Sequence, residues 1–199
     1  MEFKKNYVPV YEFIEWDDAW IHMRDHQAPI RIMYVGDSIS RGTRQVANGL
    51  FGTEIVFDNF ATSKALDNPY FFDSMSLFVK QEPYHTAFLF NNGLHGWHLS
   101  EEEYEEWYAD FMDKLVATYG KESLYIVTTT FSTSPDYPNE RVIARNMIAR
   151  CLAEQRGLKI IDLYPVAAAN KEHLLDGVHF ARPGYEALAR EIVRCIKGS

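Results

Sequence analysis

The sequence has few cysteines and no long apolar run. These two features disfavour metal-binding or redox cysteine motifs and membrane-spanning proteins. The two cysteines, Cys151 and Cys195, lack the spacing of a zinc or redox motif, so we expect reduced thiols in a cytoplasmic protein. No apolar stretch approaches the length that crosses a bilayer, and the N-terminus lacks the apolar core of a secretory signal peptide. We therefore expect no membrane span and no signal peptide in this N-terminus, and removal of a leader from a longer precursor stays open.

Two other absences bear on ligands. The chain has no phosphate loop of the GxxxxGK[ST] type and no GxGxxG, so a nucleotide-binding flavodoxin-like domain ranks last among the interpretations. Asp and Glu number 28 against 20 Lys and Arg, and the net charge of −8 disfavours nucleic acid or an anionic membrane as partner. We predict no cofactor.

Metal binding is also disfavoured. His95 and His98 are three residues apart, but no further ligand stands at a convincing spacing, so we predict no metal site. The other histidines outside the C-terminal segment are expected at the surface or in helix caps; they are His22, His26, His85 and His173.

Strand and helix patterns alternate about five times along the 199 residues, with no internal repeat and no low-complexity linker. This alternation predicts a single α/β domain over residues 1–199. We expect a three-layer α/β/α sandwich with a five-stranded, mainly parallel, flavodoxin-like sheet. The expected strands are 30–35, 53–61, 85–93, 123–130 and 158–164. Before them, the spacing of Trp16, Trp20 and Met23 predicts a helix from Asp17 or Asp18 to Arg24 or His26.

The stretch IRIMYVGDSISRG, residues 30–42, organises the chain. Its apolar half predicts a buried parallel strand, which ends at Gly36 before a helix over 39–50. Ser38 then lies at the carboxyl end of the sheet, where open α/β sheets bind their ligands. Asp and Ser before a helix are also ordinary capping residues, and we assign Asp37 that structural role.

The far end of the chain distinguishes these two interpretations of Ser38. Asp176 and His179 stand three residues apart, just before the last predicted helix over 183–196. Ser, His and Asp are the nucleophile, base and orienting group of acyl-transfer catalysis, whatever their order in the chain. We predict that Ser38 attacks a carbonyl carbon, that His179 moves its proton and that Asp176 orients His179.

An acyl-transfer site also needs donors for the oxyanion of its tetrahedral intermediate. We expect the backbone N–H of Ser38, a backbone N–H near Lys64 and a side chain from the FNNGLHG segment, residues 90–96, to supply them. In that segment, His95 and Asn92 are the candidates.

These motifs resemble those of the SGNH hydrolases, also called the GDSL esterase/lipase family, over most of the chain. GDSIS matches the family's GDS block with Ser38 as nucleophile, and DGVH matches its DxxH block with Asp176 and His179. The two middle blocks differ. Ser63 or Lys64 stands where the family has an oxyanion-hole Gly, and GLHG places His95 where GxND has its Asn.

The resemblance implies a serine esterase acting on small acyl esters, with acetyl groups on carbohydrates as our expectation. The altered middle blocks support an alternative, a binding protein that kept the fold and has weak or no catalysis. The predicted partner is a small-molecule ester, and the sequence does not specify the oligomeric state.

Overall fold

A single six-stranded sheet forms the centre of the protein. The structure, a computed structural model, describes residues 7–82 and 84–198, so the first six residues of the N-terminal segment lie outside it. The strands are β1 Asp17–Trp20, β2 Ile30–Gly36, β3 Ile55–Thr62, β4 Ala87–Phe90, β5 Leu124–Val127 and β6 Lys159–Ile161. Their order is β1-β3-β2-β4-β5-β6, and β1 pairs antiparallel with β3 while the other pairs are parallel.

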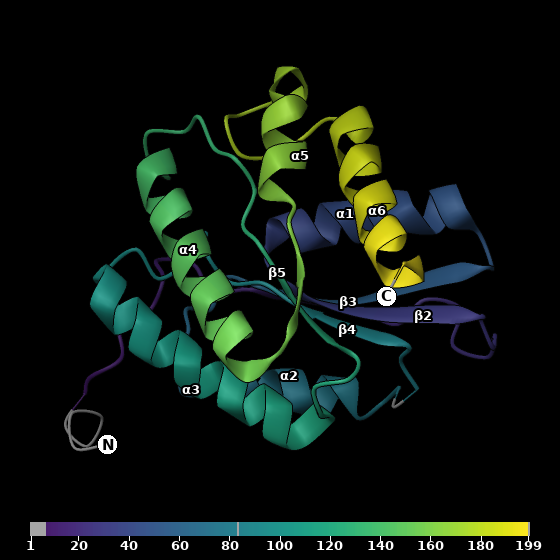
Figure 1. Cartoon of the computed structure of the whole chain (residues 1–199), viewed down its shortest axis with the longest axis horizontal. Coiled ribbons are helices and arrows are strands. Elements are labelled where there is room, and N and C mark those ends of the chain that lie inside the picture. Colours follow the sequence, from purple (N-terminus) through teal and green to yellow (C-terminus); the bar gives the residue numbers. More distant parts are fainter. Residues whose placement is uncertain (1–6, 83, 199) are drawn as a thin grey trace.

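Helices cover both faces of this sheet. They are α1 Ser38–Phe51, α2 Phe71–Val79, α3 Glu101–Tyr119, α4 Asn139–Arg156, α5 Tyr164–Ala169 and α6 Arg182–Lys197. Figure 1 shows α1, α5 and α6 on one side of the sheet and α2 and α3 on the other. Helix α4 contacts α3 and completes that layer. The predicted α/β three-layer architecture is confirmed.

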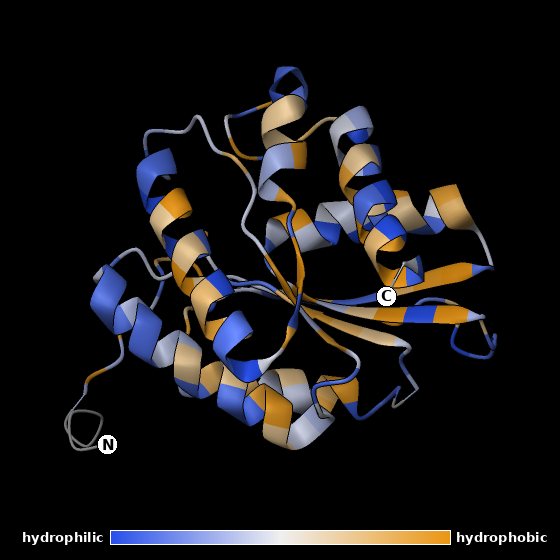
Figure 2. Ribbon diagram, in the orientation of Figure 1, coloured by the Kyte–Doolittle hydropathy of each residue, from blue (hydrophilic) through white to orange (hydrophobic). Residues whose placement is uncertain are grey.

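The core consists of two apolar layers that the central strands separate. On β2, Ile32 and Tyr34 belong to the cluster on the α1 and α6 side, while Met33 and Val35 belong to the cluster on the α2 and α3 side. This alternation follows from the two-residue period of a strand. Figure 2 shows the strands predominantly hydrophobic and the helices with mixed faces, as expected for a sheet buried on both sides.

The N-terminal segment differs from the prediction. Residues 17–20 form strand β1, so the predicted helix from Asp17 or Asp18 is wrong, and the sheet has six strands where the sequence predicted five. Two of the residues whose spacing predicted that helix are not core either, since Trp20 is 49% exposed and Met23 is 40% exposed. Pairing with β3 gives the backbone N–H and C=O groups of this segment their hydrogen-bond partners. This long-range interaction outweighs the helical spacing of the segment's apolar side chains.

Most of the other boundaries follow local signals. Ser100 and Glu103 form a capping box at the start of α3. Helix α4 ends at Gly157, which is in the left-handed conformation. Within the described ranges, no helix combines the length and the apolar character that a membrane span requires.

Candidate active site

Ser38 lies where strand β2 passes into helix α1. Asp37 is the N-cap of that helix, and its Oδ1 accepts a hydrogen bond from the backbone N–H of Ile39 at 2.8 Å, which confirms its predicted structural role. The turn is tight, because a Cβ on Gly36 would lie 2.9 Å from the Cβ of Ser40. Ser38 is thus the first helical residue, and the backbone N–H groups of its turn have no acceptor within the helix.

The structure brings the two ends of the chain together at this point. The Nε2 of His179 lies 2.7 Å from the Oγ of Ser38, a contact across 141 residues. The Nδ1 of the same ring lies 2.7 Å from Oδ2 of Asp176. A carboxylate only accepts, so Nδ1 carries a proton, and Nε2 of the neutral ring is then free to accept the Ser38 hydroxyl proton.

Asp176 is held as an anion by its own loop. Its Oδ1 accepts hydrogen bonds from the backbone N–H of His179 at 2.7 Å and of Val178 at 3.0 Å. Burial acts to raise the pKa of Asp176, but these bonds and the side-chain bond to His179 outweigh it and lower the pKa to about 2. The orienting carboxylate therefore stays ionised at neutral pH.

The loop that carries Asp176 and His179 is fixed by backbone contacts. Leu174 and Phe180 form an antiparallel bridge, and the N–H of Leu175 donates to the carbonyl of His179 at 2.8 Å. Gly177 has a φ of 87°, and an added Cβ would lie 2.9 Å from the backbone nitrogen of Ser134. A glycine is needed here because the chain is both left-handed and in close contact with the next loop.

Ser38 and His179 open into a cavity of about 290 Å³. Its lining combines the N-terminal segment, the start of α1, the loop after β4, the loop before α4 and the loop before α6; the residues are Trp16, Ser38, Arg41, Leu94, His95, Tyr137, Val178 and His179. This volume is at the lower end of the range for small-ligand sites. The cavity has room for a small group next to the hydroxyl of Ser38.

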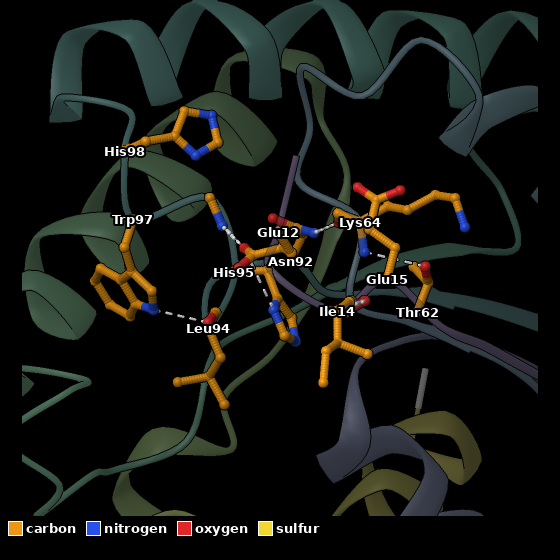
Figure 3. Close-up of polar contacts among 12 residues, drawn as sticks. Glu12, Ile14, Glu15, Thr62, Lys64, Asn92, Leu94, His95, Trp97 and His98 are labelled. Atoms are coloured by element: carbon orange, nitrogen blue, oxygen red, sulfur yellow. Dashed lines mark hydrogen bonds and ion pairs between the residues drawn. The ribbon is translucent and has the colours of Figure 1, made fainter. Parts of the chain in front are cut away.

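The structure separates the three other predicted donor residues. His95 lines the cavity with Ser38. Asn92 is buried below it, and its Nδ2 donates to the carbonyl of Lys64 at 3.1 Å. The backbone N–H of Lys64 donates to Oγ1 of Thr62 at 3.1 Å (Figure 3).

The Lys64 side chain does not enter the cavity. Its Nζ lies 2.7 Å from both carboxylate oxygens of Asp17 on strand β1, and Figure 3 shows the side chain extending away from His95. Lysine in place of glycine therefore adds an ion pair to the sheet edge and no cation at the mouth of the cavity.

Two of the remaining histidines, His98 and His85, each contact a different aspartate. His98 contacts Asp67, with 3.0 Å between Nε2 and Oδ2. His85 was predicted at the surface or in a cap, but its side chain is buried and its Nε2 lies 3.1 Å from Oδ2 of Asp58. Across residues 7–82 and 84–198, no three His, Cys, Asp or Glu side chains are grouped so as to hold a metal ion.

Sequence reasoning missed the contribution of the N-terminal segment to this site. The N–H of Trp16 donates to the Oγ of Ser63 at 2.9 Å, and the N–H of Ser63 donates to the carbonyl of Trp16 at 3.1 Å. These bonds place the Trp16 ring in the cavity wall, with the guanidinium of Arg41 5.4 Å from its centre. No local pattern signals this contact, because the partner residues are distant in sequence.

Comparison with known proteins gives structural matches only. No protein-family model matches the chain, and no curated protein matches it in sequence. A lipase/acylhydrolase from Enterococcus faecalis superposes with a TM-score of 0.66 at 19% identity, over 85% of this chain and 96% of that one. A GDSL-like lipase from Bacteroides thetaiotaomicron gives 0.64 at 15% identity, over 84% and 88%.

A third similar structure is an acetylxylan esterase from Geobacillus stearothermophilus. It superposes with a TM-score of 0.61 at 14% identity, over 87% of this chain and 96% of that one. Each match spans most of both chains, although the sequences have diverged widely. The protein therefore has the SGNH hydrolase fold, the fold of the GDSL-type acylhydrolases.

Proposed function

We propose that the protein is a serine esterase that hydrolyses small acyl esters through Ser38, His179 and Asp176. The observation that carries this proposal is the continuous chain of two hydrogen bonds, each 2.7 Å long, from the Ser38 hydroxyl through the His179 ring to the Asp176 carboxylate. This is the arrangement of nucleophile, base and orienting group that acyl transfer requires.

In the first half of the reaction, the Oγ of Ser38 bonds to the carbonyl carbon of the ester. His179 takes the hydroxyl proton at Nε2 and then gives it to the oxygen of the leaving alcohol as the carbon–oxygen bond breaks. Asp176 stabilises the imidazolium that forms between these steps. The product of this half is an acyl group on Ser38 and a free alcohol.

Water completes the second half by the same route. His179 takes a proton from water, whose oxygen attacks the acyl carbon, and then returns the proton to Ser38 as the acid leaves. Both halves place negative charge on the carbonyl oxygen. The backbone N–H of Ser38 and the imidazole of His95 are our candidates for its donors, since both residues line the cavity.

The size of the cavity supports a short acyl group. About 290 Å³ must hold the acyl group and part of the alcohol, which suits acetyl and excludes a long chain from full burial. Trp16 and Tyr137 in its wall offer aromatic faces to an alcohol such as a sugar. One similar structure is an acetylxylan esterase, which favours acetylated carbohydrate as the substrate class.

The proposal is tested by hydrolysis of p-nitrophenyl acetate. We expect turnover by the wild type and a loss on the order of 10⁴- to 10⁶-fold in kcat for Ser38→Ala. Ser74→Ala is the matched control, because Ser74 lies on helix α2 and is not among the residues that line the cavity. A wild type with no turnover across short acyl esters, or Ser38→Ala with full turnover, would favour the silent binding protein.

A further inference from the structure

A second pair of histidine and carboxylate lies at the same cavity. The Oε1 of Glu12 is 3.6 Å from Nδ1 of His95, and the same oxygen accepts a hydrogen bond from the backbone N–H of Gly96 at 2.9 Å. Figure 3 shows Glu12 and His95 facing one another. Both side chains are mostly buried, with 28% and 16% of their surface exposed.

The segment that carries Glu12 is anchored on both sides. Before it, the hydroxyl of Tyr7 donates to Oδ2 of Asp67 at 2.9 Å. After it, Oε1 of Glu15 accepts from Nδ2 of Asn68 at 2.8 Å. Glu12 therefore occupies a defined position above the loop after β4, across 84 residues from Gly96.

The approach of Glu12 bears on the proton positions of His95. At 3.6 Å the contact is longer than a hydrogen bond, but a carboxylate attracts an N–H and repels a lone pair, so it favours a proton on Nδ1, the His95 nitrogen that faces Glu12. Neutral imidazole has one N–H, which leaves Nε2 without a proton to donate. For His95 to donate to an oxyanion through Nε2, both nitrogens must be protonated, and the donor is then a cation.

We propose that Glu12 is a positioning residue that holds His95 as an imidazolium donor to the oxyanion of the reaction. The inference rests on the proposed esterase function. It explains how histidine replaces the asparagine of the resembling family: the amide donates without a partner, whereas the imidazole needs a carboxylate beside it. A cationic donor also binds an anion more strongly than a neutral one.

The ionisation of Glu12 agrees with this pairing. The close approach of His95 is the largest influence on Glu12, and together with the hydrogen bond from the Gly96 N–H it lowers the pKa of the carboxyl below its usual value despite burial. The other charged or titratable groups in the cavity wall are Arg41, Tyr137 and His179. Among the residues that line the cavity with His95, none carries a carboxylate, so Glu12 supplies that charge from beside the cavity.

A double-mutant cycle tests whether Glu12 acts on catalysis through His95. Glu12→Gln keeps an oxygen for the Gly96 N–H and removes the charge, and we expect it to lower kcat for p-nitrophenyl acetate at least about tenfold with little change in KM. His95→Asn supplies a donor that needs no partner, so Glu12→Gln in that background should change kcat by less than about twofold. Glu106→Gln on the exposed face of α3 is the matched control for loss of one carboxylate away from the cavity, and it should retain wild-type kcat.

Two results would overturn the proposal. One is an unchanged kcat in Glu12→Gln; the other is an equal loss in the wild-type and His95→Asn backgrounds, which would mean that Glu12 acts only on the loop. A second measurement is independent of turnover, namely the ¹⁵N chemical shifts of the His95 ring, assigned by comparison with His95→Asn. We expect the shifts of a ring protonated at both nitrogens at pH 7, and a neutral ring or an unprotonated Nδ1 would refute the proposal even if the protein had no esterase activity.

Discussion

Arg145 on α4 holds the carbonyl oxygen of His95, with 2.7 Å between Nη1 and the oxygen. The same guanidinium donates to the carbonyl of Gly93 at 3.2 Å and to that of Gly96 at 2.7 Å. It lies between the rings of Trp97 and Tyr104, 4.3 Å and 4.4 Å from their centres, and is fully buried. One side chain thus fixes the backbone of the loop that presents His95.

Arg145→Lys is expected to weaken both stability and catalysis. Lysine has no planar fork of donors, so buried carbonyls lose their partners, and we expect a loss of about 3 kcal/mol in the free energy of unfolding. Urea unfolding measures this loss, and p-nitrophenyl acetate hydrolysis should show a lower kcat because His95 is no longer held in place. Wild-type values in both experiments would show that the loop keeps its shape without Arg145.

Asp176→Asn should reduce kcat on the order of 10⁴-fold while the fold is retained. The amide no longer stabilises the imidazolium and permits the wrong tautomer of His179. Because the pKa of Asp176 is lowered to about 2, its ionised form is favoured, and its protonation contributes only at pH values near or below 2.

A pH profile of kcat/KM checks this consequence. Between pH 4 and pH 9, Asp176 stays ionised, so we expect no loss of wild-type activity from its titration. An acid limb that disappears in Asp176→Asn would show that Asp176 titrates within that range.

A buried ion pair at the opposite end of the sheet should determine how the stability of the fold changes as the pH falls. The Nη1 of Arg31 lies 2.8 Å from Oδ2 of Asp58, with side-chain exposures of 6% and 0%. Burial raises the pKa of Asp58, but bonds from His85, the His22 N–H and Arg31 outweigh it and lower the pKa below its usual value. Since the folded pKa is depressed, Asp58 stabilises the fold above the unfolded pKa of about 3.9, and this contribution is lost as the pH falls.

Asp58→Asn should lower the free energy of unfolding by about 3–5 kcal/mol at pH 7, since it leaves the buried Arg31 without its anion. Asp113→Asn is the control, because Asp113 is 64% exposed in its pair with Arg156 and should cost less than about 1 kcal/mol. Denaturant unfolding at pH 7 and pH 4 measures both effects. Equal losses in the two variants would contradict the role of burial.

Substrate length gives a test of the cavity. The cavity volume of about 290 Å³ predicts that kcat/KM is highest for acetyl and butyryl esters and falls for longer chains. A series of p-nitrophenyl esters from acetyl to palmitoyl measures this trend. Equal or faster cleavage of palmitoyl would show that long chains bind outside the cavity.

Local patterns in the sequence predicted the layers of the fold. The apolar runs, the capping box at Ser100 and the glycine after α4 are signals that neighbouring residues determine. Strand β1 could not be predicted in this way, because its structure depends on pairing with β3 and on the Asp17–Lys64 ion pair.

The candidate site was predictable to a similar extent. Ser38, Asp176 and His179 stand in recognisable motifs, and the structure places them within hydrogen-bond distance. Our proposal of His95 in preference to Asn92 rests on the burial of Asn92 and its bond to the Lys64 carbonyl. Glu12 and Trp16 have no motif at all, and only the folded N-terminal segment brings them to the cavity.

Active-site labelling tests the central claim most directly. A fluorophosphonate reacts with a serine only when a base activates its hydroxyl, so intact mass spectrometry after reaction with such a probe reports on the Ser38–His179 pair. We predict one label per folded chain, located on Ser38 by peptide mapping, and no label on Ser38→Ala or on the urea-unfolded wild type. A folded wild type that stays unlabelled, or that is labelled at another residue, would contradict the account.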